Sequence, residues 1–239
     1  MKSDFIKKIN RKGESIIYAF SALNTPKGKF QFFNSLAGID ANLTFINSKD
    51  NDWYQRGIPG VNDELSDCAR VIIKNKEHLY KVCIGSSMGG YGAGLYSIEI
   101  NADVAILFGS EFKIGLPFSR SKLHMPNNII ANYGDLSEII SSSVAKTQFF
   151  VFIGDGDIID LYNGTLVSEL SNVHLYNIKG SGHNVTKYIV DNICSIKDLI
   201  SIITSDKKKA VDVLFNGKLS FDIREKKNSL QLYMKRISC

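Results

Sequence analysis

The sequence is poor in the features that mark secreted or membrane-spanning proteins. No run among its 239 residues approaches the roughly 18 to 20 apolar residues that cross a bilayer. The N-terminal stretch MKSDFIKKINRKG has no apolar core of the kind that a secretory signal needs. We therefore expect no transmembrane segment and a cytoplasmic location.

Cysteine is also scarce. The four cysteines, Cys68, Cys83, Cys194 and Cys239, form no CxxC pair and have no regular spacing. They predict neither a disulfide framework nor a zinc site, and buried or incidental thiols are the simpler interpretation. Because no cluster of His, Asp and Glu has the spacing of metal ligands either, no metal is expected.

The composition is that of an ordinary globular protein, with 44% hydrophobic and 22% charged residues. The length suits one domain with a substantial core. The net charge of +5 is concentrated at the end, where residues 205–239 hold nine Lys/Arg against four Asp/Glu. We expect one domain over residues 1–204 and a basic extension over 205–239, packed on it or appended to it. The extension is a solvated face or a contact for an acidic partner; it lacks the interleaved aromatics of a nucleic-acid binding module.

Short β-favouring runs alternate with polar or helical stretches. These runs cover 15–23, 41–48, 80–85, 101–110, 147–157 and 172–183. Residues 63–79 carry apolar side chains at helical spacing. The alternation predicts an α/β fold, with a mostly parallel central sheet and helices on both faces. Ligands bind beyond the carboxyl ends of the strands in such sheets, where several runs close in Gly, Ser, Asp or His.

One of these strand ends carries a candidate nucleophile. Gly85-Ser86-Ser87-Met88-Gly89 fits the pattern GxSxG, directly after an expected strand and at the start of an expected helix. That context is typical of a nucleophile elbow, which would project Ser87 from the sheet. A phosphate-binding loop fits less well, since Tyr91-Gly92-Ala93 stand where Lys and Ser/Thr are needed. A glycine-rich turn that only packs a helix on a strand is the structural alternative.

The stretch GSSMGGYGAG (85–94) resembles the elbow of α/β-hydrolase-fold esterases and acyltransferases. Residues 15–200 are similar to them in order and spacing. Residues 43–60 resemble hydrolase-fold proteins of bacterial surface-polysaccharide synthesis, including capsule O-acetyltransferases. This resemblance implies an α/β-hydrolase fold and an acyl enzyme directed at a carbohydrate, with acetyl as the expected acyl group. It implies no cofactor, apart from acetyl-CoA as the donor if the enzyme is a transferase.

A serine nucleophile needs an imidazole base, and four histidines are available. His183 follows an expected strand near the end of the fold, where the hydrolase order Ser, acid, His requires it. His174 lies within that strand, His78 on a helix before the elbow, and His124 in a middle loop, as a candidate for substrate contact. We expect His183 to be the base.

The acid should follow a strand between Ser87 and His183, and FFVFIGDGDIID offers Asp155, Asp157 and Asp160. The family resemblance favours Asp157, which matches a Gly-x-x-Asp pattern. We prefer Asp157 over Asp155 because a carboxylate too close to the strand end would point away from the histidine. The two stay open as alternatives, and unused aspartates beside glycine suit turns.

The oxyanion hole is expected to use two backbone amides. One is Met88 N–H, after the nucleophile, and the other is Ser21 or Ala22 N–H in the loop after an early strand. The His-Gly dipeptide often found in that loop is missing. Any non-proline residue still supplies an amide.

Three residues are candidates for binding the substrate. Trp53 and Tyr54 stand beyond a strand end, where they would stack on a sugar or close over an acyl group; anchoring the loop to the core is the equal alternative. Glu111, with Arg120, lies in a segment (109–120) that would line the pocket. Residues from about 111 to 135 are the expected insertion over the site.

The function expected from the sequence is acyl transfer through acyl-Ser87, from a small ester or acyl donor. Water resolves the intermediate in an esterase, and a sugar hydroxyl of a glycan acceptor resolves it in an O-acyltransferase. The alternative is a non-catalytic accessory or binding protein of polysaccharide synthesis on a hydrolase scaffold.

Overall fold

The computed structural model describes residues 3–74, 79–125 and 130–237, so His78 and Cys239 lie outside the described residues. These ranges form one seven-stranded sheet in the order β1-β3-β2-β4-β5-β6-β7, in which only β1 runs antiparallel to its neighbour. The strands are β1 Ile6–Ile9, β2 Ser15–Phe20, β3 Asn42–Ile46, β4 Tyr80–Ser86, β5 Val104–Phe108, β6 Gln148–Gly154 and β7 Val173–Ile178.

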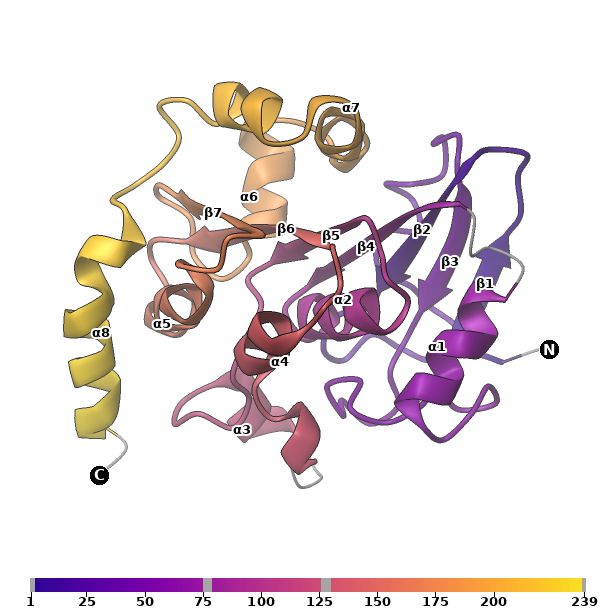
Figure 1. Ribbon diagram of the computed structural model, residues 1–239, viewed down its shortest axis with the longest axis horizontal. Helices are drawn as coiled ribbons and strands as arrows, with labels where there is room; N and C mark the ends of the chain where they lie inside the picture. The colour runs from indigo at the N-terminus through magenta and orange to yellow at the C-terminus, as the bar shows by residue number, and fades with distance from the viewer. Residues whose placement is uncertain (1–2, 75–78, 126–129, 238–239) are drawn as a thin grey trace.

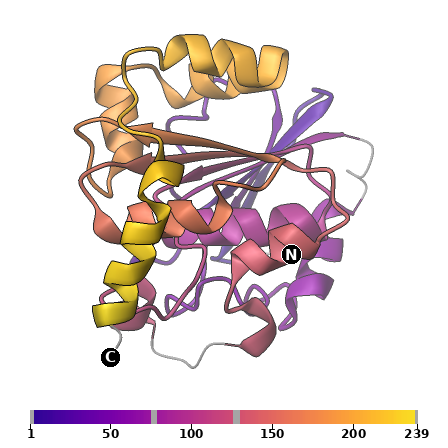
Figure 2. The same cartoon turned by 60° about the vertical axis from the view of Figure 1, so that its left-hand side comes forward.

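Helices cover both faces of this sheet. They are α1 Leu65–Ile73, α2 Met88–Glu99, α3 Arg120–His124, α4 Leu136–Ser142, α5 Ile158–Val167, α6 Val185–Asn192, α7 Ile196–Leu214 and α8 Ile223–Ile237, with a 3₁₀ turn at Ala131–Tyr133. In Figure 1, α6 and α7 lie on one face, and α1, α2, α4 and α5 lie on the other. Figure 2 shows the same three layers from a second side. The predicted mostly parallel sheet with helices on both faces is confirmed.

The alternation of side chains along the strands builds a separate apolar core on each face. Ile16 and Tyr18 point into the core that α1, α2 and α5 close, whereas Ile17 and Ala19 point into the core under α6 and α7. Both sides of β2 are thus buried, as expected of a central parallel strand. Burial on both sides holds the carboxyl ends of the strands in fixed positions.

The basic C-terminal segment contributes to this packing. The boundary expected at residue 205 lies inside α7, and beyond it Val211 and Phe215 are fully buried in the core under α6 and α7. Residues 218–220 pair with the end of β7, and α8 then packs along α5 (Figure 1). No helix within the described ranges is both long and apolar enough to cross a membrane.

Candidate active site

Ser87 sits on a strained turn between β4 and α2. Its backbone has φ 54° and ψ −122°, a conformation that non-glycine residues rarely adopt. The turn needs glycine beside it. A Cβ on Gly85 would lie 1.9 Å from the Gly89 carbonyl oxygen, and one on Gly89 would lie 2.4 Å from the Phe20 carbonyl oxygen. The structure thus shows the sharp strand-to-helix turn predicted from GxSxG, with Ser87 half-buried at the start of α2.

His183 meets Ser87 from the loop between β7 and α6. Its Nε2 lies 2.9 Å from Ser87 Oγ, and its Nδ1 lies 2.9 Å from both carboxylate oxygens of Asp160. This geometry suits an imidazole that donates from Nδ1–H to the carboxylate and accepts the serine proton at Nε2. The two residues predicted from opposite ends of the fold are brought within hydrogen-bond distance.

The carboxylate beside His183 belongs to Asp160, which corrects the expected Asp157. Asp157 is the N-cap of α5, and its Oδ1 accepts the N–H groups of Ile159 and Asp160, each at 3.0 Å. Asp160, three residues further along, lies in the first turn of α5 and is fully buried against the imidazole. Asp155 is also excluded from this position, because its Oδ1 accepts Gly180 N–H at 2.8 Å and so fixes the loop after β7.

Arg120 ties α3 to both carboxylates of α5. Its Nη2 lies 2.6 Å from Asp157 Oδ2, and its Nη1 lies 3.7 Å from Asp160 Oδ1. Burial works to raise the pKa of Asp157, but the hydrogen bonds from Arg120 and from the Asp160 N–H outweigh it and lower that pKa overall. Burial raises the pKa of Asp160, and the hydrogen bond with His183 limits the rise. Arg120 therefore supplies the positive charge that lets two aspartates lie side by side.

Asp157, Asp160 and His183 also form a group whose possible ligand atoms lie within 4.8 Å of one another. Both ring nitrogens of His183 are engaged, one by Asp160 and the other by Ser87. The guanidinium of Arg120 already provides the cation that Asp157 faces. We assign no metal to this group.

The amides expected to form the oxyanion hole differ in their contacts. Ser21 N–H donates to the Ile46 carbonyl at 2.9 Å, continuing the pairing of β2 with β3, so this candidate is already used within the sheet. Ala22 N–H donates to the side-chain oxygen of Gln31 at 2.9 Å, a contact that the sequence did not suggest. Met88 N–H lies in the first turn of α2, where helix amides have no intrahelical acceptor.

Trp53 and Tyr54 are core residues, which corrects their expected role in substrate binding. Trp53 is fully buried and Tyr54 is 2% exposed. The Tyr54 ring lies against Gly92 of α2, where a Cβ would come within 2.4 Å of it. Its hydroxyl donates to the Ser21 carbonyl at 2.8 Å. The loop-anchoring alternative is therefore the one that the structure supports, and Tyr54 holds the segment that follows β2.

Glu111 is likewise buried, 2% exposed, and does not line an open surface. Its carboxylate accepts the backbone N–H groups of Arg120 and Ser121 and the Ser121 hydroxyl. Burial raises its pKa, and these hydrogen bonds oppose the rise. The role of Glu111 is to hold the start of α3, and so to aim Arg120 at α5.

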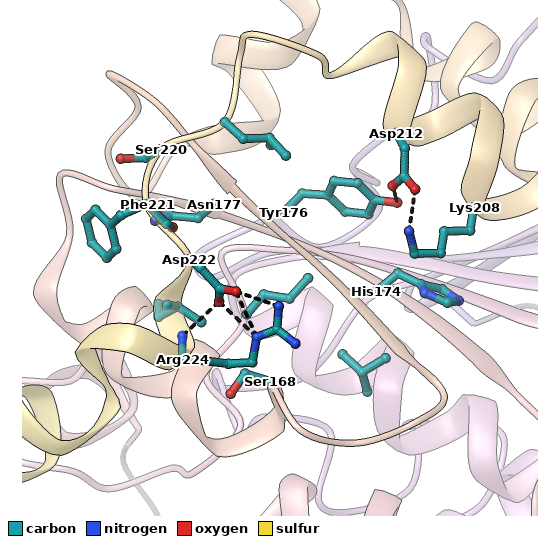
Figure 3. A pocket seen from close by; sticks show the side chains of 14 residues that line it. Ser168, His174, Tyr176, Asn177, Lys208, Asp212, Ser220, Phe221, Asp222 and Arg224 are labelled. Atoms are coloured by element: carbon teal, nitrogen blue, oxygen red, sulfur yellow. Dashed lines mark hydrogen bonds and ion pairs between the residues drawn. The ribbon is translucent and has the colours of Figure 1, made fainter.

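The remaining described histidines lie away from Ser87. His174 is on β7 and contacts Gln148 Oε1 through Nε2 at 3.2 Å, and His124 is exposed at the end of α3. A cavity of about 360 Å³ lies near His174, at the outer edge of β7. Figure 3 shows that α7, with Lys208 and Asp212, and the start of α8, with Arg224, border it. Ser87 and His183 are not among the residues that line this cavity.

The sheet order and the serine turn define the α/β-hydrolase fold, and likeness to solved structures confirms it. The capsule O-acetyltransferase of Neisseria meningitidis serogroup A superposes with a TM-score of 0.59 at 16% identity, over 84% of this chain and 92% of that one. A mutant of the same enzyme has been solved with CoA. FphF, a fluorophosphonate-binding serine hydrolase of Staphylococcus aureus, superposes with a TM-score of 0.57 at 13% identity, over 83% of this chain and 86% of that one.

A chain of the Gap123 glycosylation-associated protein complex of Streptococcus agalactiae gives a TM-score of 0.59 at 13% identity. The match covers 82% of this chain but 43% of that one. No model of a known protein family matches the sequence, and no curated protein matches it. At these identities the likenesses establish the fold alone.

Proposed function

We propose that this protein is a serine-dependent acyl enzyme, an esterase or an O-acyltransferase, that works through an acyl-Ser87 intermediate. The observation that carries the proposal is the continuous contact from Ser87 Oγ through His183 to the buried carboxylate of Asp160, with 2.9 Å at each step. A hydroxyl next to a neutral imidazole that a carboxylate orients is the arrangement that makes serine nucleophilic.

In the acylation step, Ser87 Oγ forms a bond to the acyl carbon while its proton passes to His183 Nε2. Asp160 stabilises the imidazolium that results. The negative charge on the acyl oxygen develops near the Met88 N–H, at the positive end of the α2 dipole. The bond from the acyl carbon to the leaving group then breaks, and the leaving group takes the proton from His183.

The second step repeats the chemistry with a different nucleophile. His183 removes a proton from water or from a sugar hydroxyl, whose oxygen attacks the acyl carbon and releases Ser87. We favour acetyl transfer to a carbohydrate, with acetyl-CoA as donor and a glycan as acceptor. This choice is supported by the sequence resemblance and by the shared fold of the meningococcal capsule O-acetyltransferase, which has been solved with CoA.

Intact-mass measurement of the purified protein tests the proposal. Incubation with p-nitrophenyl acetate, and separately with acetyl-CoA, should add the mass of one acetyl group to the wild type and none to Ser87→Ala. Loss of that adduct on addition of a glycan, with acetyl recovered on the sugar, would identify a transferase. Absence of any adduct from a folded wild type with both donors, together with release of p-nitrophenol no faster than from Ser87→Ala, would refute the acyl-enzyme function.

A non-catalytic accessory role is the second candidate, because the same fold occurs in a chain of the Gap123 glycosylation-associated protein complex. In that role the hydrolase scaffold would serve binding, and Ser87 would be dispensable. A Ser87→Ala protein that keeps the full cellular effect of the wild type would support this role over catalysis.

A further inference from the structure

The register of the sheet places Ala22 beside the serine turn. β2 and β4 run parallel and their pairing ends with Phe20 opposite Gly85, so Ala22 follows β2 at the same edge of the sheet at which Ser87 follows β4. Neighbouring strands lie about 4.8 Å apart. Gly89, in the first turn of α2, packs directly on the Phe20 and Ser21 carbonyl groups. Ala22 therefore lies at the edge of the sheet where the serine turn packs on the end of β2.

The direction of the Ala22 amide follows from its neighbour. Successive N–H groups of an extended chain point to opposite sides, and Ser21 N–H points to β3, where it donates to Ile46. Ala22 N–H therefore points away from β3, toward Gln31. The hydrogen bond from the Tyr54 hydroxyl to the Ser21 carbonyl holds the peptide between Ser21 and Ala22 in this orientation.

On that side the amide is already engaged by Gln31. The side-chain oxygen of Gln31 accepts Ala22 N–H at 2.9 Å, and the Gln31 backbone N–H donates to Ser21 Oγ at 3.2 Å. A carboxamide oxygen has the same acceptor chemistry as the acyl oxygen of a substrate. Gln31 is half-buried and not enclosed in the core, and its backbone N–H is anchored on Ser21 Oγ.

We propose that Gln31 gates the oxyanion hole. In the resting protein its side-chain oxygen occupies the Ala22 N–H, and it swings away when an acyl oxygen binds between that amide and Met88 N–H. This gate rests on the proposed acyl-Ser87 function and specifies how the site accepts a donor. A small ester must displace Gln31 without help, whereas a larger donor has further contacts with which to do so.

Stopped-flow acylation of Ser87 by p-nitrophenyl acetate tests the gate, using Gln31→Ala and Gln31→Met, which both remove the carboxamide. We expect both variants to acylate about fivefold faster than the wild type, because the hydrogen bond to be broken is worth about 1 kcal/mol. Gln31→Glu keeps an acceptor and adds charge, so it should acylate more slowly. Gln231→Ala, on the exposed side of α8, is the matched control and should equal the wild type.

The outcomes separate the two claims. Circular dichroism first shows that Gln31→Ala and Gln31→Met are folded. If the wild type forms an acyl adduct but both variants acylate more slowly, the gate is overturned and the acyl-enzyme function is kept. Unchanged rates in both variants also overturn the gate. A wild type that forms no adduct and releases p-nitrophenol no faster than Ser87→Ala removes the acyl enzyme, and the gate with it.

Discussion

The comparison of Asp160→Asn with Asp157→Asn tests which aspartate serves the proposed catalysis. Asp160 is fully buried and holds His183 Nδ1 with both oxygens at 2.9 Å, so water cannot take its place. An asparagine amide would offer an N–H to Nδ1 and favour the tautomer that cannot accept the Ser87 proton. We expect kcat/KM to fall by about 10³- to 10⁴-fold, or about 4–5.5 kcal/mol.

Asp157→Asn should reduce kcat/KM much less than Asp160→Asn. Asparagine caps a helix as well as aspartate does, so the N-terminus of α5 keeps its hydrogen bonds. The substitution removes the ion pair with Arg120 but leaves the contact between Asp160 and His183 in place. We expect kcat/KM to fall by less than about tenfold.

Both variants are to be assayed in parallel for ester hydrolysis under single-turnover conditions, with thermal unfolding to confirm that each is folded. A fall of about 10³-fold in kcat/KM for Asp157→Asn, with Asp160→Asn within about tenfold of the wild type, would contradict the assignment of Asp160.

Three further predictions concern the surroundings of the site. Gly89→Ala should lower the free energy of unfolding by at least about 2 kcal/mol, because its Cβ would clash with the backbone at the end of β2. Gly182→Ala is the control, since its Cβ would meet nothing within 4 Å, and denaturant unfolding of both variants measures the difference. Arg120→Met should lower the free energy of unfolding by about 1–2 kcal/mol near neutral pH. The pKa of Asp157 lies below its ordinary 3.8, so the loss of unfolding free energy in Arg120→Met should be fully present above pH 3.8 and vanish as the pH falls through the lowered pKa. An equal loss at every pH would contradict the ion pair between Arg120 and Asp157. Tyr54→Phe should slow acylation several-fold and lower the free energy of unfolding by about 1 kcal/mol. An unchanged acylation rate would show that the Tyr54 hydroxyl does not position the peptide between Ser21 and Ala22.

The sequence predicted the sheet and its serine turn because both depend on local patterns. Buried parallel strands appear in the sequence as apolar runs, and GxSxG marks a turn where glycines admit a close backbone approach. The edge strand β1 was not predicted, because Ile6–Ile9 is short and its two central lysines are exposed. Pairing with β3 defines it, and that pairing joins residues far apart in the chain.

The choice of acid was wrong because it depended on where α5 begins. Asp157 followed by apolar residues is also an N-cap signal, and a helix that starts at Ile158 turns Asp160 toward His183. That signal was available in the sequence. The contact between Gln31 and Ala22 was not, since it joins residues nine positions apart across an irregular loop.

Burial of the aromatic pair was equally hard to predict. Trp53 and Tyr54 lie in a polar loop and both adopt positive φ values of 55° and 56°, which turn them inward. Loop backbone of this kind is set by tertiary packing, here by the small residue Gly92 that admits the Tyr54 ring.

Site mapping with a fluorophosphonate probe, which bonds covalently to activated serines, tests directly whether Ser87 is a nucleophile. We expect one adduct, located on Ser87 by peptide mass spectrometry, absent from Ser87→Ala and strongly reduced in His183→Ala. Labelling at another residue, or none on the folded wild type under conditions that label a known serine hydrolase, would contradict it.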